Sequence, residues 1–380
     1  MKISIVVSNS LKKDPRVIKQ IKIAIQQGYK VQFVGYNDKF ADREFLDGLG
    51  IKYDLVDLGD DYLGKLRSPI KKIKRLFLRP RKAIEYICDF KPDIIHANDF
   101  DTLGLAMSAS KRCKAKVIYD SHEIFAENIG IAENTMLKKY IIWRERHLVK
   151  KVDAMISVSN AAAVYFEKKY KIKKPTVITN CPMRNTIPLK EKAKDKFEVV
   201  YQGLMVLGRG YEEFVMAAKY IDDNIRFILR GYGGIENKLK NMIKENKLED
   251  KVMFEEPVEV AQLVSAASSS HVGIVLTRPV NLNFELSISN KVFEYADAGL
   301  PVILSDVPEH RYLNEKYDFG IIIEDVTPEN IAKAVNDLYR DKDLYNKLLE
   351  KAKKMAEEMV WENEAKKLIK IYEKLSEESK

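Results

Sequence analysis

Short apolar runs alternate with amphipathic stretches along nearly the whole chain. Runs of this kind predict strands buried on both faces of a parallel sheet, and the stretches between them predict the covering helices. In the first half we expect helices such as 14–28 and 101–113, and strands at 2–7, 30–36, 94–98, 116–120, 154–158 and 176–179. In the second half we expect strands near 197–203, 225–230, 252–255, 272–277 and 301–305. The fold class is therefore α/β, with two doubly wound, Rossmann-like parallel sheets in series that face a cleft.

The alternation stops around residues 181–196, where Pro, Lys and Asn dominate, as in an exposed connection between domains. A chain of 380 residues also exceeds what one hydrophobic core usually serves. We therefore predict a first domain over 1–185, a second over 186–340 and a helical segment over 341–380. The last segment either packs back on the first domain or forms a solvated capping helix.

The composition is that of a globular protein, with 46% hydrophobic and 32% charged residues. No apolar run approaches the roughly 20 residues of a membrane-spanning helix. The first residues lack the pattern of a secretory signal, so we expect a cytoplasmic protein. Its three cysteines, Cys88, Cys113 and Cys181, are widely spaced, odd in number and without nearby histidines, which fits neither a disulfide framework nor a zinc site.

Residues 65–82 carry nine Lys or Arg and no acidic residue. Ile70, Ile73 and Phe77 recur there at helical spacing, as in a helix that lies on an anionic membrane surface. This pattern predicts peripheral attachment to the inner face of a membrane, and a solvated basic helix face is the alternative. Nucleic acid is not an expected partner, because no base-reading or RNA-binding motif accompanies the charge.

The segment 287–303 contains a short predicted helix that carries an unusual charge at its start. Asn290 suits the N-cap, and Gly299 ends the helix. Lys291 then stands at the first helical position, where the helix dipole disfavours a cation unless an anion is also present. A diphosphate would remove that conflict, and Glu294, one turn later, could accept hydrogen bonds from the diol of a ribose. The alternative is an ordinary ion pair between the two side chains on an exposed face.

Arg209 has a similar place, after a predicted strand and before a predicted helix. Its neighbours Gly208 and Gly210 would let the backbone approach a phosphate, whose oxygens a guanidinium can bind in a bidentate fork. An exposed loop arginine is the alternative. The loop 229–234 also offers Gly231 and Gly233 after a strand, so three strand ends of one domain suit a nucleotide.

In the first domain, the segments 96–101 and 119–125 place polar residues at the ends of strands. We expect His122 to contact a donor sugar or its phosphate, and Asp99, Asp14 or Arg16 to hold acceptor hydroxyls, although each residue also suits a structural role. Residues 8–17 lack the glycine pattern of a dinucleotide site.

Asp99 and Asp101 together resemble the DxD motif that holds a metal in single-domain GT-A glycosyltransferases. We favour Asp101 as a helix N-cap and expect no metal and no other cofactor, because the second sheet with its phosphate-like loops does not suit a single-domain metal enzyme.

From the first strand to about residue 340, the sequence resembles the retaining GT-B glycosyltransferases of family 4. The matching pieces keep their order: DPRV (14–17), the histidine of YDSHE, SVS (157–159), ITN (178–180), RG (209–210), the GYG loop and NKVFEYADAGLPVI (290–303). The resemblance implies that Arg209 and Lys291 neutralise a donor diphosphate, that Glu294 holds the ribose and that His122 lies near the reacting bond. It also implies a metal-independent mechanism, with a donor site that includes Gly231, Gly233, Glu285, Ser289 and Asn290.

The sequence departs from the family pattern in two respects. Many members have a glutamate eight residues before the one at Glu294, where this chain has Leu286, with Glu285 displaced by one. The family's loop lysine is replaced by Arg209, and the arginine that usually precedes it is missing, since Gly203 and Leu204 stand there.

The predicted function is transfer of a hexose-type sugar from a nucleotide diphosphate sugar to a hydroxyl of a lipid-linked, polysaccharide or other glycan acceptor. A nucleotide-sugar 2-epimerase of the same architecture is the first alternative. The second is a membrane-associated scaffold that binds a nucleotide sugar without turnover.

Overall fold

The structure of the protein is a computed structural model that describes residues 1–12, 14–56, 81–128, 131–184 and 186–378. It divides into two compact units. Unit 1 comprises Met1–Asn180 with Glu364–Lys380, and unit 2 comprises Cys181–Asn363. The division therefore lies within a few residues of the predicted one, at the start of the irregular connection.

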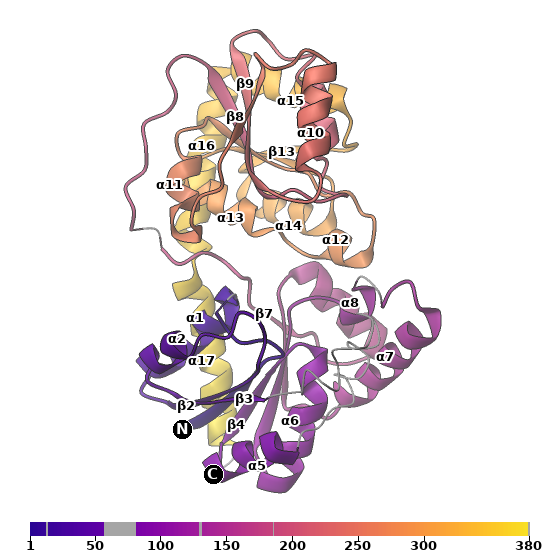
Figure 1. The fold of residues 1–380 in the computed structure, drawn as a ribbon, viewed down its shortest axis with the longest axis vertical. Helices are drawn as coiled ribbons and strands as arrows, with labels where there is room; N and C mark the ends of the chain where they lie inside the picture. The colour runs from indigo at the N-terminus through magenta and orange to yellow at the C-terminus, as the bar shows by residue number, and fades with distance from the viewer. Residues whose placement is uncertain (13, 57–80, 129–130, 185, 379–380) are drawn as a thin grey trace. The chain divides into compact units, whose positions relative to one another are not determined.

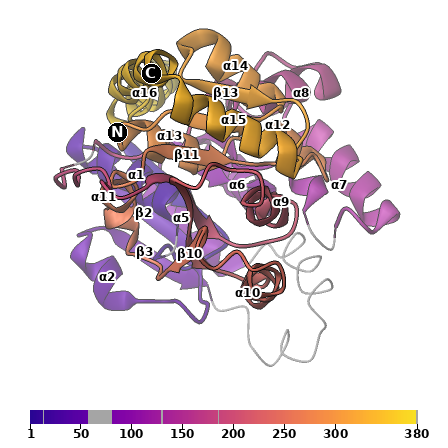
Figure 2. The same cartoon turned by 90° about the horizontal axis from the view of Figure 1, so that it is seen from above.

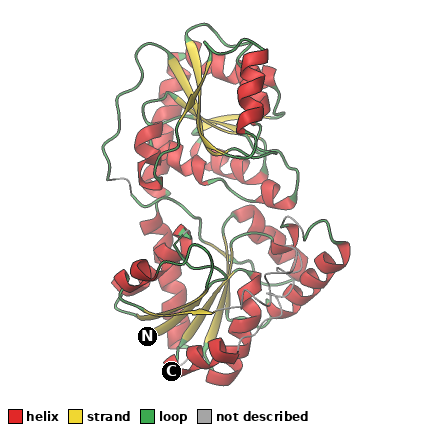
Figure 3. Cartoon of the chain, in the orientation of Figure 1, coloured by secondary structure: helices red, strands yellow, loops and turns green. Residues whose placement is uncertain are grey.

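The core of unit 1 is a seven-stranded parallel sheet with the order β3-β2-β1-β4-β5-β6-β7 (Figures 1 and 3). Its strands are β1 (Lys2–Val6), β2 (Lys30–Tyr36), β3 (Lys52–Val56), β4 (Ile94–Asn98), β5 (Lys116–Ser121), β6 (Ala154–Ser157) and β7 (Thr176–Val177). Every residue of β4 is buried, as expected for a central strand covered on both faces.

The connections of unit 1 are helices: α1 (Pro15–Gln26), α2 (Arg43–Gly48), α5 (Arg81–Phe90), α6 (Phe100–Cys113), the 3-10 turn η1 (Phe125–Glu127), α7 (Thr135–Leu148) and α8 (Asn160–Tyr170). Local capping explains where α1 begins. Asp14 is its N-cap and accepts a hydrogen bond from the Val17 N–H, and Pro15 occupies the first turn.

Unit 2 contains a six-stranded parallel sheet with the order β10-β9-β8-β11-β12-β13. Its strands are β8 (Phe197–Leu204), β9 (Ile225–Tyr232), β10 (Val252–Glu255), β11 (Val272–Val275), β12 (Val302–Ser305) and β13 (Gly320–Ile323). Its helices up to the last strand are α9 (Tyr211–Ala217), α10 (Glu236–Glu245), the 3-10 turn η2 (Val260–Gln262), α11 (Leu263–Ala267), α12 (Leu282–Leu286), α13 (Asn290–Asp297) and α14 (Pro308–Tyr317).

Helices cover both sides of the unit 2 sheet, and an apolar core lies on each side (Figure 2). One core includes residues of α9, α10 and α15 (Pro328–Arg340), and the other includes residues of α11, α13, α14 and α16 (Lys342–Glu358). The two parallel sheets with covering helices confirm the predicted α/β class.

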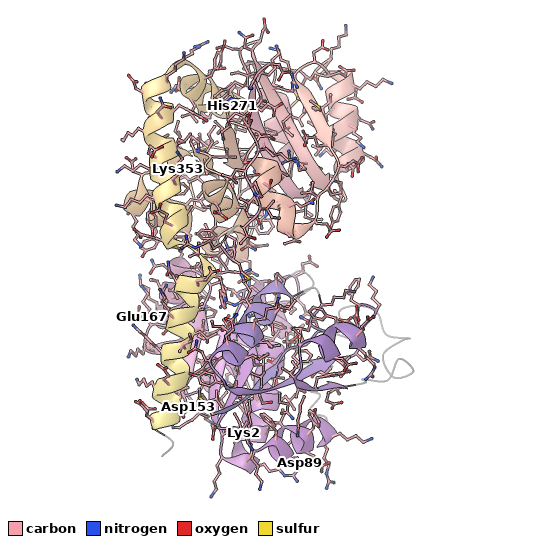
Figure 4. The ribbon with its side chains drawn as sticks, turned by 90° about the vertical axis from the view of Figure 1, so that its left-hand side faces the viewer. Lys2, Asp89, Asp153, Glu167, His271 and Lys353 are labelled. Carbon is pink, nitrogen blue, oxygen red and sulfur yellow. The ribbon has the colours of Figure 1, made fainter. Side chains whose placement is uncertain are left out.

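The last helix, α17 (Trp361–Glu377), belongs to unit 1 from Glu364 onward. Its residues 365, 368, 372 and 375 recur at helical spacing and are at most 3% exposed. Its final turns lie beside Asp153, at the start of β6 (Figure 4). The segment 341–380, predicted as one helical part, is therefore divided between the two units: α16 packs in unit 2, and most of α17 packs in unit 1.

Each sheet contains the point at which ligands of open α/β folds usually bind, where the strand order reverses. In unit 1 this point lies between β1 and β4, and in unit 2 between β8 and β11. A ligand is therefore expected to contact the residues just after these strands. No helix in the described ranges is long and apolar enough to cross a bilayer.

Candidate active site

A pocket of about 330 Å³ opens at the carboxyl end of β8 in unit 2. It is lined by Gln202, Gly203, Arg209, Leu263, Ile288, Ser289, Asn290, Lys291 and Glu294. The structure thus brings together five of the predicted donor-site residues, namely Arg209, Ser289, Asn290, Lys291 and Glu294. They come from the loop after β8 and from the first two turns of α13.

Arg209 is held from two sides by residues of unit 2. Its Nη1 donates a hydrogen bond to Thr277 Oγ1 at 3.1 Å, and its guanidinium carbon lies 4.3 Å from the centre of the Phe284 ring. Flanking Gly208 and Gly210 have positive φ angles of 80° and 64°, which favour glycine. These contacts hold the guanidinium of Arg209 in place, and several of its N–H groups can still donate hydrogen bonds to a ligand.

Lys291 crosses the face of Gly203 instead of extending away from the helix. A Cβ atom added at Gly203 would lie 2.8 Å from Lys291 Cε and 3.1 Å from its Nζ. Burial lowers the pKa of Lys291 to about 8, with nearby Arg209 acting in the same direction and Glu294 opposing it. Two positive side chains thus share one small pocket, an arrangement that an anion would stabilise.

Glu294 lies at the inner end of this pocket beside a buried glutamine. Gln202 Nε2 donates to Glu294 Oε2 at 3.2 Å, while Gln202 Oε1 accepts from Arg230 Nη1 at 3.2 Å. Because Arg230 is itself paired with Glu255, it orients the amide so that its NH₂ group faces Glu294. Burial raises the pKa of Glu294, and Lys291 and the Gln202 hydrogen bond oppose that shift.

Several predictions about unit 2 need correction. Helix α13 begins one residue earlier than predicted, with Ser289 in the N-cap position and no side-chain capping bond, so Lys291 is its second residue. Gly231 and Gly233 do not line the pocket. A Cβ at either position would lie 2.1 Å from a backbone oxygen, of Gly203 or of Met205, so both glycines serve the close approach of adjacent chain segments. Glu285 lies on α12 and is also absent from the pocket lining.

In unit 1, the ends of β4 and β5 bring His122 between two carboxylates. His122 Nδ1 lies 3.3 Å from Asp99 Oδ2, and its Nε2 lies 3.6 Å from Asp120 Oδ2 and 3.0 Å from Asn98 Oδ1. Burial alone would lower the pKa of His122, but Asp99 and Asp120 raise it to about 9. The imidazole is therefore a cation at neutral pH, with 18% of its side chain exposed.

Asp99 holds the backbone that carries this histidine. It has a φ of 63°, a conformation that side-chain-bearing residues seldom adopt, and its Oδ1 accepts the backbone N–H of His122 at 3.0 Å. Asp99 also occupies the N-cap position of α6, so the prediction of Asp101 as N-cap is wrong, and Asp101 stands within the first turn. The carboxylate of Asp99 is still 24% exposed.

Two of the predicted acceptor residues have structural partners. Arg16 is buried, and it binds Asp120 through Nε and Nη2 at 3.0 and 2.8 Å and the Ile178 carbonyl through Nη1 at 2.9 Å. Asp14 caps α1 and accepts a further hydrogen bond from Asn9. The structural reading therefore fits both residues better than acceptor binding.

Sequence reasoning missed the residues that orient the site, among them Asp120, Gln202, Thr277 and Phe284. Asp120 belongs to the segment 119–125, whose polar residues at a strand end had already marked it as a candidate site, so Asp120 could have been recognised from the sequence. Gln202 interrupts the apolar residues of β8, which is a weaker indication of a site residue. Among the described residues, no group of three or more His, Cys, Asp or Glu side chains is arranged to hold a metal ion.

The sequence matches two protein-family models, one in each unit. Residues 183–355 match the family described as glycosyl transferases group 1, and residues 22–181 match glycosyltransferase family 4. No curated protein matches the sequence.

Solved structures share the fold over nearly the whole chain. A glycosyltransferase from Rickettsia africae is 16% identical, with 98% of each chain covered and a TM-score of 0.73. HepE from Anabaena in complex with UDP is 15% identical, with 98% of this chain and 100% of that chain covered and a TM-score of 0.75. Sucrose-phosphate synthase from Thermosynechococcus elongatus is 15% identical, with 99% of each chain covered and a TM-score of 0.72.

The two parallel sheets with covering helices form the GT-B type of fold. Each unit matches a model of a glycosyltransferase family, so the chain is similar to glycosyltransferases in both units.

Proposed function

We propose that the protein transfers a hexose-type sugar from a nucleotide diphosphate sugar to a hydroxyl acceptor, with retention of configuration at the anomeric carbon. The observation that carries the proposal is the pocket that Arg209, Lys291 and Glu294 line together. It offers two cations for a diphosphate and a partly buried carboxylate for the ribose diol. Proteins of similar fold are described as binding UDP-glucose, in the case of Anabaena HepE, or as a galactosyltransferase of the lipopolysaccharide outer core.

In the proposed reaction, the bond between the anomeric carbon and the diphosphate oxygen breaks. The acceptor oxygen bonds to the same face of the sugar, and its proton passes to the departing phosphate oxygen. Negative charge therefore grows on the diphosphate in the transition state, where fixed cations stabilise it most. Arg209 and Lys291 would supply this charge stabilisation, so the proposal requires no metal ion.

In the proposed reaction, residues of unit 1 bind the acceptor and contact the donor sugar. The imidazolium of His122 would contact the donor sugar or its phosphate, and the partly exposed carboxylate of Asp99 would hold an acceptor hydroxyl. Asp99 and Asp120 keep His122 charged, which supports contact with an anionic leaving group. Lipid-linked and glycan acceptors both fit this chemistry.

The deciding experiment incubates the purified protein with labelled UDP-, GDP-, ADP- and dTDP-sugars, with and without a lipid and glycan extract. The proposal predicts sugar transfer that requires the extract, and a product whose anomeric configuration by NMR equals that of the donor. Epimer formation without acceptor would support the 2-epimerase, and nucleotide binding without conversion would support the scaffold. An inverted product would contradict retention.

Attachment to a membrane on its cytoplasmic side is a further part of the proposal. The basic segment 65–82 lies outside the described residues except for Arg81 and Lys82. A second observation supports the idea, because α7 lies at the edge of unit 1 and Met136 and Trp143 on it are 84% and 57% exposed (Figure 1). Exposed Lys139 and Arg146 share that helix face. Tryptophan beside cations suits the boundary of an anionic lipid surface.

A further inference from the structure

Three neighbouring strands of unit 2 each carry one polar side chain at the same level of the sheet. Gln202 of β8 pairs in register with Arg230 of β9, and Arg230 pairs with Glu255 of β10. All three residues stand near the carboxyl ends of their strands. Because residues paired in register point to the same face of a sheet, these side chains form a polar row across the three strands.

Hydrogen bonds join the polar row from end to end. Arg230 Nη1 donates to Gln202 Oε1 at 3.2 Å, and its Nε and Nη2 donate to Glu255 Oε2 at 2.8 and 2.6 Å. At the other end of the row, Gln202 donates to Glu294 in the pocket. The polar row therefore starts beside the pocket carboxylate and ends two strands away from β8, about 10 Å at the usual strand spacing.

Two members of the polar row keep unused hydrogen-bonding groups. Arg230 uses three of its five N–H groups, and the structure describes no partner for the other two, although the residue is only 4% exposed. Both bonds to Glu255 end on Oε2, so its Oε1 has no partner among the described residues, and 36% of the side chain is exposed. Buried polar groups normally have partners, so the row offers donors and an acceptor to a ligand.

The direction of the polar row indicates which part of a donor would reach it. Arg209 bonds to Thr277, which follows β11, so this cation lies on one side of β8. The row extends from β8 to the other side, across β9 and β10. In the proposed donor site, Glu294 holds the ribose between these two directions. Because the ribose of a nucleotide joins the phosphates to the base, the base would point along the row.

The edge of guanine is complementary to the unused groups of the polar row. Guanine has the acceptor O6 beside two donors, N1–H and N2–H, so Arg230 can donate to O6 while Glu255 Oε1 accepts from the donors. In uracil and thymine, an oxygen stands in place of the amino group and would face the carboxylate. In adenine the donor and the acceptor are exchanged, so its amino group would face the guanidinium.

We propose that Arg230 and Glu255 recognise the nucleobase of the donor and select guanine, so that the protein uses a GDP-sugar. Gln202 is a positioning residue in this arrangement, because it connects Arg230 to Glu294. The inference rests on the proposed function, since the sites proposed for the ribose and the diphosphate determine where the base lies. Those two sites make the same contacts with every nucleoside diphosphate, so they do not select the base.

The test compares five nucleotides by calorimetric titration of the full chain: GDP, IDP, UDP, ADP and dTDP. IDP is the sharpest comparison, because its base is guanine without the N2 amino group. We expect GDP to bind at least about tenfold more tightly than each of the others, since only guanine satisfies both side chains. Equal binding of GDP and IDP, or tighter binding of UDP, ADP or dTDP, would overturn the proposal.

Glu255→Gln tests the assigned acceptor. Arg230 needs the amide oxygen of the new side chain, so the amide NH₂ group would face the N–H donors of guanine. We expect the affinity for GDP to fall about tenfold and the difference between GDP and IDP to disappear. Glu256→Gln is the matched control, because Glu256 is the next residue and is exposed, and it should bind GDP normally. An unchanged ratio of GDP to IDP affinity in Glu255→Gln would contradict the assignment.

The results distinguish this inference from the proposed function. Thermal unfolding shows whether Glu255→Gln is folded, and the comparison of nucleotides in the unaltered protein requires no variant. Tight binding of a nucleotide other than GDP would overturn the selection of guanine and leave the proposed sugar transfer intact. If none of the five nucleotides binds, the proposed function and this inference both fail.

Discussion

At the scale of single residues, the pocket in unit 2 contains a partly buried lysine, Lys291, beside a second cation, Arg209. The pKa of Lys291 is lowered to about 8, so above that pH the free protein loses the proton. A bound diphosphate favours the charged form and raises the pKa again. Binding and protonation of this residue are therefore linked.

This linkage gives a pH dependence with a definite sign. Above about pH 8, binding of a nucleoside diphosphate must be accompanied by proton uptake, so its affinity should fall by up to tenfold for each further pH unit. Calorimetric titration with UDP and with GDP in buffers of different ionisation enthalpy measures both quantities. In Lys291→Met the proton uptake should disappear, and its persistence there would assign the linkage to another group.

The end of the Lys291 side chain packs against Gly203. In the glycosyltransferase family that the sequence resembles, this region usually carries an arginine. Gly203→Ala would push the ammonium group aside, because the added Cβ would lie 2.8 Å from Lys291 Cε. We expect nucleoside diphosphate affinity to fall about tenfold, a loss close to that of one charge-assisted hydrogen bond.

Gly234→Ala is the matched control for that substitution, because a Cβ there meets nothing within 4 Å. Gly203→Ala also strains a residue with a φ of 115°, so thermal stability must be measured beside affinity. In a Lys291→Met background the effect of Gly203→Ala on affinity should be small. An equal effect there would mean that the glycine acts through the backbone instead of the lysine.

At the scale of elements, the apolar runs predicted the central strands because those strands are buried on both faces. The missed strands, β3 and β13, lie at the edges of their sheets. β3 has the sequence KYDLV, whose charged residues interrupt the apolar run. The short apolar run of β13, GIII, was not recognised as a strand, although the edge strands β7 and β10 were.

The residues of the pocket in unit 2 could be predicted largely from local sequence, because Arg209 and Lys291 each stand at a strand or helix end where a positive charge needed an explanation. The network behind His122 could not. Arg16 and Asp120 are 104 positions apart, and only the folded unit brings their side chains together beside His122. Gly231 and Gly233 show a limit of this reasoning, because a glycine required by close backbone contact looks the same in sequence as one required by a ligand.

If the protein attaches to a membrane, the exposed apolar residues of helix α7 should contribute to that attachment. Replacing Met136 and Trp143 by Ser should reduce sedimentation with vesicles that contain phosphatidylglycerol several-fold, because two exposed apolar side chains no longer enter the lipid boundary. Charge reversal at Lys71, Lys72, Lys74 and Arg75 should abolish it if the basic segment is the main contact.

The control for α7 is Tyr220→Ser, which changes an exposed aromatic residue of unit 2 that is 52% accessible. Its sedimentation should equal that of the unaltered protein. If the α7 and charge-reversal variants both bind anionic vesicles unchanged, the membrane part of the proposal is wrong.

At the scale of the whole molecule, the chain returns to unit 1 after unit 2 is complete, so the stability of unit 1 depends on its last helix. Leu368→Ala on α17 should destabilise unit 1 by about 2–5 kcal/mol, as expected for a buried leucine. Leu348→Ala on α16 is the matched change within unit 2. Hydrogen exchange resolved by peptide should show faster exchange in unit 1 for the first variant and in unit 2 for the second. Equal effects on both units in either variant would contradict this division.

The central claim is that one pyrophosphate binds to both Arg209 and Lys291, and calorimetric titration of the double variant Arg209→Met/Lys291→Met tests it most directly. With UDP, GDP, ADP and dTDP as probes, each single variant should bind the preferred nucleotide about 10- to 100-fold more weakly, and the double variant should show no measurable binding. The control Arg278→Met removes an exposed arginine paired with Glu213 and should bind normally. A double variant that retains the affinity of the unaltered protein would contradict the account.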